Sequence, residues 1–268
     1  MSFFKPKKSL GQHILQDTNI ARKIVNSLTL KNYSGILEIG PGTGILTEFI
    51  LKNVDKYLGI EIDSSLIELL QDRFSEHTNF SLIQQDFLEF DLEKTLKKFP
   101  DHSKIILGNI PYNITSPILF KLYDYADSLY QAVLMVQKEV GNRIRAKEGR
   151  KDYGLLSIFS QLFADVDYMF NVPAKLFYPR PKVDSAVIKF LFYKSVKDGF
   201  ADFELFKKVV RTCFQHRRKM LRNSLSQLFS EDVLSKLSFS LSQRPEQLSI
   251  DQWRELFKQI YQICSEVN

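Results

Sequence analysis

Between residues 35 and 136, short apolar runs alternate with segments whose apolar residues repeat at helical spacing. The apolar runs cover residues 35–39, 57–62, 80–84, 105–107 and 132–136. The helical patterns between them cover residues 45–52, 64–74 and 116–123. Strands joined through helices by short connections pair in parallel, with helices on both faces of the sheet. The pattern predicts an α/β fold with a mostly parallel sheet, whose ligands bind at the carboxyl ends of the strands.

The segments on either side of this alternation have a different character. Residues 1–16 are basic and interrupted by Pro6 and Gly11, which predicts an N-terminal arm rather than a regular element. Asp17 is placed to cap a helix, and Asp63 to cap the helix at residues 64–74. Farther along, residues 155–163 have a helical pattern and residues 183–192 form a long apolar run expected to pair near the sheet edge.

After residue 199 the strand patterns stop. Everything from residue 203 onward has a helical pattern, Pro245 opens a new segment, and Ser249 to Gln252 has the form of a capping box. We therefore expect a boundary between residues 195 and 199. It divides the chain into a sheet-containing domain at 1–196, with the arm at 1–16, and a small helical domain at 197–268.

Charge and cysteine content narrow the class of protein. The net charge of +6 and the pI of 9.1 favour a polyanionic partner. Two distant cysteines and four scattered histidines form neither a disulfide framework nor a metal-ligand pattern. The N-terminus lacks the apolar core of a signal peptide, and no apolar run is long enough for a membrane span. We expect a soluble, cytoplasmic protein.

A glycine-rich loop, Gly40-Pro41-Gly42-Thr43-Gly44, follows the first apolar run. Glycines there let the backbone turn sharply and approach a ligand closely. Glu61 ends the second run, where a carboxylate can accept both ribose hydroxyls, and Asp86 follows the third, where one can accept from an adenine amine. Three such features at consecutive strand ends favour a nucleoside-containing cofactor. The glycine loop alone would also suit an NAD-dependent oxidoreductase.

The tetrapeptide Asn109-Ile110-Pro111-Tyr112 follows the fourth run. These residue types also suit an ordinary turn. They equally provide what methylation of an aromatic amine needs. The Asn109 side-chain oxygen and the Ile110 carbonyl can accept the N–H hydrogens and stabilise the developing positive charge. Pro111 would stiffen the loop, and the Tyr112 ring could stack on an extruded base, worth about 1–3 kcal/mol.

The glycine loop and the tetrapeptide together closely resemble the adenine-N6 ribosomal RNA methyltransferases, over almost the whole chain. Residues 8–15 are similar to the family's N-terminal motif, and residues 177–185 match its late motif. The resemblance implies a Rossmann-like class I methyltransferase domain with a mostly parallel sheet, followed by a small all-helical C-terminal domain. It also implies S-adenosylmethionine as the cofactor.

Site residues follow from the resemblance by position. It implies cofactor contacts at His13, Leu15, Gly40, Gly42, Glu61, Asp86 and Asn109. It implies a catalytic role for Asn109, Ile110, Pro111, Tyr112 and Phe177, with Phe177 stacking on the target base opposite Tyr112. Two positions depart from the family's pattern: His13 stands where asparagine is commoner, and Ile14 where phenylalanine is usual.

Basic residues near the start and in the helical tail are candidates for phosphate contacts. Arg211, Arg218 and Arg222 recur at helical spacing and are expected to form a basic stripe. The full candidate set is Lys7, Lys8, Arg211, Arg217, Arg218, Lys219 and Arg222. The segment from Phe214 to Lys219 also resembles the tail of the small-subunit adenine dimethyltransferases, which the macrolide-resistance methylases usually lack.

The resemblance implies dimethylation of two neighbouring adenines near the 3′ end of 16S rRNA, in the small ribosomal subunit or its precursor. We expect a monomer with no metal and no membrane partner. Two alternatives within reach of the same motifs are a 23S rRNA adenine-N6 methyltransferase that confers macrolide resistance and a non-catalytic RNA-binding factor.

Overall fold

The computed structural model describes residues 6–7, 10–30, 34–99 and 104–267, and the chain divides into two compact units. The sheet unit comprises residues 1–141 and 164–193, and the helical unit comprises residues 142–163 and 194–268. Each is described by itself. The expected single boundary at residue 196 misses the segment 142–163, because aromatic rings join that segment to the C-terminal helices. Phe159 meets Phe206, and Phe163 meets Phe203, in edge-on contacts.

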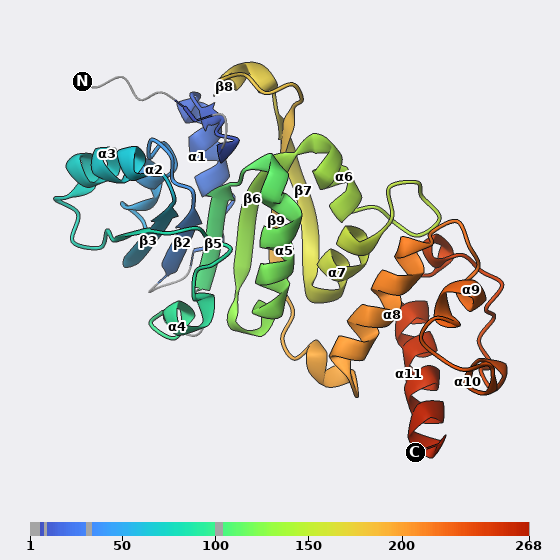
Figure 1. Cartoon of the computed structure of the whole chain (residues 1–268). Coiled ribbons are helices and arrows are strands. Elements are labelled where there is room, and N and C mark those ends of the chain that lie inside the picture. The colour runs from blue at the N-terminus through green and yellow to red at the C-terminus, as the bar shows by residue number, and fades with distance from the viewer. Residues whose placement is uncertain (1–5, 8–9, 31–33, 100–103, 268) are drawn as a thin grey trace. The chain divides into compact units, whose positions relative to one another are not determined.

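A seven-stranded sheet forms the centre of the sheet unit, in the order β4-β3-β2-β5-β6-β9-β7 (Figure 1). The strands from β4 to β6 in this order pair in parallel. Strand β9 pairs antiparallel with β6, and β7 pairs antiparallel with β9. Their bounds are β2 Gly35–Ile39, β3 Lys56–Glu61, β4 Leu82–Gln84, β5 Lys104–Asn109, β6 Gln131–Gln137, β7 Ala164–Val172 and β9 Ser185–Phe192. A mostly parallel α/β sheet is confirmed.

Two pairings were not predicted. The first is the antiparallel pairing of the edge strand β7 with β9. Strand β7 alternates buried and exposed residues because only one of its faces is covered. A separate two-stranded sheet pairs β1 Ile14–Leu15 with β8 Phe177–Tyr178 in antiparallel register. This pairing attaches the N-terminal arm to a segment more than 150 residues later.

The helices of the sheet unit are α1 Thr18–Asn26, α2 Thr47–Ile50, α3 Ser64–Phe74, α4 Leu92–Leu96 and α5 Thr115–Asp124, and α6 Lys138–Ile144 runs on from β6. Asp17 and Asp63 cap α1 and α3 as predicted, each accepting a backbone N–H of the first turn. Figure 1 shows α5 lying across one face of the sheet. An added Cβ at Gly44 would lie 2.5 Å from the Phe74 ring, so this glycine permits close packing against α3.

The helical unit contains α7 Leu155–Phe163, α8 Phe203–Gln215, α9 Leu221–Leu225, α10 Glu231–Ser235 and α11 Ile250–Val267. The predicted capping box at α11 is present, since Ser249 N–H donates to the Gln252 side chain and Gln252 N–H donates to Ser249 Oγ. The core of this unit is largely aromatic, with Trp253 and Phe206 both fully buried. Among the described residues, no helix is long and apolar enough to cross a membrane.

Candidate active site

A pocket opens at the carboxyl ends of the parallel strands, beside the point where the strand order changes direction. The chain runs from β2 outward to β3 and β4, then returns to place β5 on the other side of β2. Loops that leave neighbouring strands in opposite directions open a crevice there. The walls come from the arm, the glycine loop and the ends of β3, β4 and β5, and include His13, Leu15, Gly40, Gly42, Glu61, Asp86, Asn109, Ile110, Pro111 and Tyr112.

The glycine loop has a backbone conformation that L side chains rarely adopt. Gly40, Gly42 and Gly44 have φ values of +62°, +60° and +83°. A Cβ built at Gly40 would meet nothing within 4 Å, so the loop backbone borders open space at this point. A ligand can therefore approach the backbone directly, as a cofactor loop requires.

Glu61 is held by the backbone around it. Its Oε2 accepts from Gly42 N–H at 3.2 Å, and its Oε1 accepts from Ile62 and Asp63 N–H at 3.0 Å each. Burial raises the pKa of Glu61, and these N–H groups partly offset the shift. The carboxylate thus lies in the pocket wall with its orientation fixed.

Glu38 is a second buried carboxyl group in the pocket wall, and sequence reasoning missed it. Its Oε2 accepts from Tyr57 Oη at 2.7 Å and from Thr47 Oγ1 at 2.8 Å. Burial raises the pKa of Glu38 to about 7. The hydrogen bonds from Tyr57 and Thr47 lower this pKa, and the nearby Glu61 carboxylate raises it. This group changes charge near neutral pH.

Asp86 lies in the loop after β4, and a lysine fixes that loop. Asp86 Oδ1 accepts from Leu88 N–H at 2.8 Å, which closes a tight local turn. Lys121 Nζ on α5 donates to the carbonyls of Phe87, Leu88 and Phe90 at 2.8, 2.8 and 2.6 Å. The ammonium group thus donates all three of its N–H bonds to one loop, and burial lowers the pKa of Lys121. Sequence reasoning missed Lys121, because only the fold brings α5 to this loop.

Asn109 at the end of β5 has its side-chain amide oriented by the arm. Its Nδ2 donates to the His13 carbonyl oxygen at 2.8 Å. Within the described part of the chain, its Oδ1 has no hydrogen-bond partner. The Ile110 side chain is buried, and its N–H donates to Met135 O, so the backbone of this residue is held against β6.

Tyr112 is held from two sides. Its hydroxyl hydrogen-bonds Ser185 Oγ at 2.7 Å, and its ring stacks on the His13 imidazole with centroids 5.4 Å apart. Burial raises the pKa of Tyr112, and the Ser185 hydrogen bond opposes the shift. His13 Nδ1 in turn donates to the Pro179 carbonyl at 2.7 Å. His13 therefore links the arm, the tetrapeptide and the loop after β8.

Phe177 is not in the pocket wall, contrary to the expectation that its ring faces the target base. It is 4% exposed and lies in the hydrophobic core with Leu15, Val172 and Val187. Residues of a strand alternate in direction, so in the short strand β8 Phe177 points inward while Tyr178 points outward and is 63% exposed. In this conformation the exposed ring of the late motif belongs to Tyr178.

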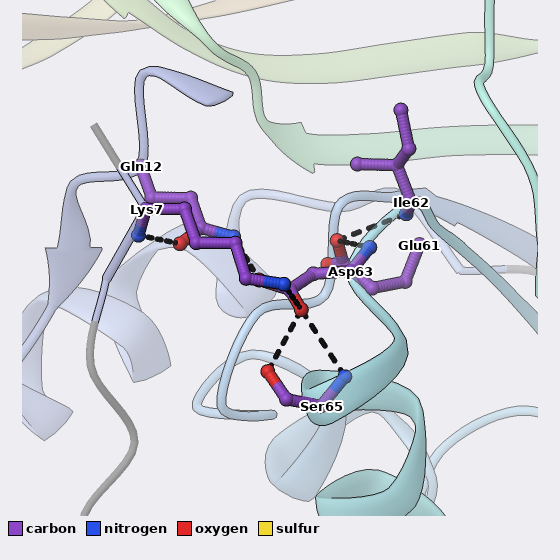
Figure 2. Close-up of polar contacts among 6 residues, drawn as sticks. All are labelled: Lys7, Gln12, Glu61, Ile62, Asp63 and Ser65. Carbon is purple, nitrogen blue, oxygen red and sulfur yellow. Dashed lines mark hydrogen bonds and ion pairs between the residues drawn. The ribbon is translucent and has the colours of Figure 1, made fainter. Parts of the chain in front are cut away.

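Lys7 was expected on an RNA track, but its Nζ forms an ion pair of 2.7 Å with Asp63 Oδ1 (Figure 2). The Asp63 side chain is fully buried, whereas the Lys7 side chain is 48% exposed, and neither residue lines the pocket. Lys8 lies outside the described residues.

The predicted basic stripe in the helical tail is interrupted. Arg211 is on α8, Arg218 and Lys219 lie in the turn after it, and Arg222 is on α9. Helical spacing therefore does not align these residues on one face. Two of the arginines are also paired: Arg217 with Glu246, and Arg222 with Glu231. Arg218 and Lys219 are exposed in the turn.

Arg217 connects two segments of the helical unit. Besides its ion pair with Glu246, its Nη2 donates to the Arg150 carbonyl at 3.2 Å. Gly149 N–H donates to the Glu246 carbonyl at 2.7 Å. The turn at 216–219 and the loop at 147–151 are thus joined through Glu246. No group of three His, Cys, Asp or Glu side chains that could hold a metal occurs in the described ranges.

Comparison with known proteins gives consistent matches. The family described as ribosomal RNA adenine dimethylase matches residues 3–262. A ribosomal RNA small subunit methyltransferase A from Mycoplasma mobile is 42% identical over 258 residues, covering 95% of this chain and 98% of that protein. A dimethyladenosine transferase structure from Plasmodium falciparum superposes with a TM-score of 0.81 at 27% identity, covering 94% of this chain and 98% of that one. A 23S rRNA methyltransferase, ErmE, has a TM-score of 0.67 at 24% identity, covering 92% and 99%, which shows a shared fold alone.

Proposed function

This chain belongs to the ribosomal RNA adenine dimethylase family, and we propose that it dimethylates N6 of two neighbouring adenines near the 3′ end of small-subunit ribosomal RNA during subunit biogenesis. The observation that carries the chemistry is the Asn109 amide, whose donor end is occupied by His13 O. Its acceptor end is thereby left for a substrate amine. The full-length match to small-subunit relatives favours this substrate over 23S rRNA.

S-adenosylmethionine fits the residues of the pocket. The open backbone at Gly40 admits close contact, since no side chain lies where a Cβ would be. Glu61 presents a buried carboxylate suited to ribose hydroxyls, and Asp86 presents a partly buried carboxylate suited to an adenine amine. His13, Leu15, Gly42 and Asn109 would complete the contacts from the arm, the glycine loop and β5. When bound, this cofactor supplies an electrophilic methyl group.

The tetrapeptide would activate the amine. Adenine N6 is a weak nucleophile because its lone pair is delocalised into the ring. Acceptors at Asn109 Oδ1 and the Ile110 carbonyl favour a pyramidal nitrogen, whose lone pair is available, and stabilise the positive charge that develops there. Pro111 has φ −58° and, with Thr115 Oγ1 bonded to its carbonyl, keeps the loop rigid. After transfer, the amine releases its proton to solvent.

Tyr112 would hold the extruded base. Its ring already stacks on His13, and its hydroxyl is anchored on Ser185, so the face used for the base is pre-oriented. Phe177 would have to leave the core to serve as the opposite face. The exposed basic residues Arg218 and Lys219, with Arg211 and Arg222, are proposed phosphate contacts of the helical unit. Ribosomal RNA as substrate makes the cytoplasm the expected location.

The proposal is tested by incubating the protein with labelled S-adenosylmethionine and either small or large subunits that lack adenine methylation. We expect dimethyladenosine in the small-subunit RNA, identified by mass analysis of its nucleosides. Methylation of the large subunit alone would assign the chain to the rival 23S activity. Binding to small subunits without any methyl transfer would support a non-catalytic factor.

A further inference from the structure

The N-terminal arm forms one wall of the cofactor pocket. Leu10, Gly11, Gln12 and His13 all line it. The arm approaches the glycine loop so closely that Ile14 Cδ1 would lie 3.3 Å from a Cβ added at Gly42. A ligand in this pocket would therefore be covered by the arm, and anything that fastens the arm affects how the ligand enters and leaves.

Besides the β1–β8 pairing, the arm is fastened at Asp63 (Figure 2). Its Oδ1 accepts from Lys7 Nζ at 2.7 Å, and its Oδ2 accepts from Gln12 Nε2 at 2.9 Å. Within the arm, Lys7 N–H also donates to Gln12 Oε1 at 2.7 Å, so the two arm residues are locked to each other. Together Lys7, Gln12 and Asp63 form what we term the arm latch.

The buried carboxylate distinguishes this latch from an ion pair in which both partners are exposed. The Asp63 side chain is 0% exposed, whereas the Lys7 side chain is 48% exposed. Burial alone would raise the pKa of Asp63, but hydrogen bonds from Lys7, Gln12 and Ser65 outweigh it and lower the pKa to about 2. A buried carboxylate that loses a charged donor is left partly unsatisfied, so opening the latch has a real cost.

The latch is also connected to Glu61, the carboxylate expected to accept the ribose hydroxyls of the cofactor. Asp63 N–H donates to Glu61 Oε1, and Glu61 Oε2 accepts from Gly42 in the glycine loop. The residue that fastens the arm is thus directly bonded, through its backbone, to the group expected to bind the cofactor. A cap role alone requires only the Ser65 contacts of Asp63. The two bonds from the arm are additional.

We propose that Lys7 and Gln12 are positioning residues that close the arm over S-adenosylmethionine through Asp63, and that Lys7 serves this latch rather than the RNA. The inference rests on the proposed cofactor. Its central consequence is that cofactor affinity, measured without RNA, depends on a lysine that lies outside the pocket wall.

The test is calorimetric binding of S-adenosylhomocysteine to the full chain, wild type and Lys7→Met, in the absence of RNA. Removing one charge-assisted hydrogen bond from a buried carboxylate is expected to weaken binding about tenfold. Lys97→Met is the matched control, because Lys97 forms an exposed ion pair with Glu93 on α4. It should leave the affinity unchanged. Gln12→Ala should act in the same direction as Lys7→Met.

Hydrogen exchange supplies a second measurement. With ligand bound, amides 10–15 should be protected in the wild type and in Lys97→Met, and should exchange faster in Lys7→Met. Equal affinity and equal protection in wild type and Lys7→Met would overturn the latch while leaving the enzyme assignment intact. Failure of the wild type to bind S-adenosylhomocysteine at all would instead overturn the proposed cofactor. Weakened RNA binding by Lys7→Met, with cofactor affinity unchanged, would return Lys7 to the RNA track.

Discussion

The side-chain amide of Asn109 donates from Nδ2 to the carbonyl oxygen of His13 at 2.8 Å. A carbonyl can only accept, so the contact fixes which end of the amide faces the arm and which faces the site. Asn109 is the last residue of β5 and His13 belongs to the arm, so the orientation of the Asn109 amide depends on a segment 96 residues earlier. The arm must therefore be in place for the Asn109 amide to keep this orientation.

Asn109→Ala is expected to lower the rate constant for methyl transfer about 100-fold, because it removes one preorganised acceptor for the developing positive charge. Asn109→Asp should be similarly impaired, since it sets a carboxylate oxygen against the His13 carbonyl. Single-turnover transfer from labelled cofactor measures this step. Asn53→Ala is the control, because Asn53 is exposed and its side-chain amide donates to the Phe49 carbonyl. Transfer by Asn109→Ala at the wild-type rate would refute the assigned role.

Tyr112 is expected to act through its ring rather than its hydroxyl. Tyr112→Phe loses the Ser185 contact and should retain activity within about fivefold, since a neutral hydrogen bond contributes about 1 kcal/mol. Tyr112→Ala loses the stacking surface and should lower kcat/KM for RNA about 5- to 150-fold. Steady-state kinetics at varied RNA concentration distinguishes the two. A larger loss in Tyr112→Phe than in Tyr112→Ala would show that the hydroxyl, not the ring, matters.

Substitutions at Phe177 and Tyr178 should distinguish a role in the stability of the fold from a role in RNA methylation. Phe177→Ala removes a core ring and is expected to lower the free energy of unfolding by about 3–5 kcal/mol. Tyr178→Ala removes an exposed ring and should change it by less than about 0.5 kcal/mol. Urea unfolding followed by circular dichroism measures both. If Phe177→Ala keeps full stability but loses RNA methylation, the ring leaves the core to stack on the base, as the family resemblance implies.

The parts of the fold that the sequence could predict are those set by local pattern. Residues 35–39 and 64–74 form a strand and a helix with the predicted bounds. The apolar run of the first segment is typical of a buried strand, the apolar residues of the second repeat at helical spacing, and Asp63 marks the helix start. The edge strand β7 was missed. Its alternation includes Asp165 and Asp167 on the open face, so it lacks the continuous apolar run of the central strands.

The site was predictable where its residues lie at strand ends, as with Gly40, Glu61 and Asn109. It was not predictable where residues distant in the sequence meet. Lys121 reaches the Asp86 loop from α5, and Lys7 reaches Asp63 from the arm, which the β1–β8 pairing joins to a much later segment. The basic stripe failed for a local reason: α8 ends at Gln215, so helical spacing cannot continue into the turn that follows.

Glu38 should make stability depend on pH. Its folded-state pKa of about 7 lies above the ordinary value of 4.5 for glutamate, so the folded protein binds a proton that the unfolded chain has lost. Stability contributed by the protonated group is complete below pH 4.5 and declines as pH rises to about 7, by about 3 kcal/mol at most. Glu61 shifts in the same direction and adds to the decline. Asp63, with its lowered pKa, contributes stability above pH 3.8 that is lost only toward pH 2.

Urea unfolding between pH 5 and 8 measures this dependence. Glu38→Gln keeps an acceptor for Tyr57 and Thr47 but cannot ionise, so its stability should fall less over the same range. The difference between the two profiles isolates Glu38 from Glu61. Parallel profiles for wild type and Glu38→Gln would mean that Glu38 does not titrate in this range.

Arg217 and its neighbours should differ in how they affect RNA binding. Arg218 and Lys219 are exposed, so replacing both with alanine should reduce the slope of log affinity against log salt by about 2. Arg217 is held by Glu246 and the Arg150 carbonyl, so Arg217→Ala should change the slope by less than about 1. It should also destabilise the helical unit by about 1 kcal/mol, because the turn loses its attachment to the loop at 147–151.

Fluorescence anisotropy with a ribosomal RNA hairpin at 50–200 mM salt, together with urea unfolding, measures both effects. The matched control is Lys236→Ala with Lys258→Ala, which removes the same charge from exposed positions on the helical unit. A slope reduced equally by this control would mean that net charge, not the turn, sets the affinity. A larger change in slope for Arg217→Ala than for Arg218→Ala would mean that Arg217 leaves Glu246 to bind phosphate, since an arginine that stays in its ion pair releases no counterion from the RNA.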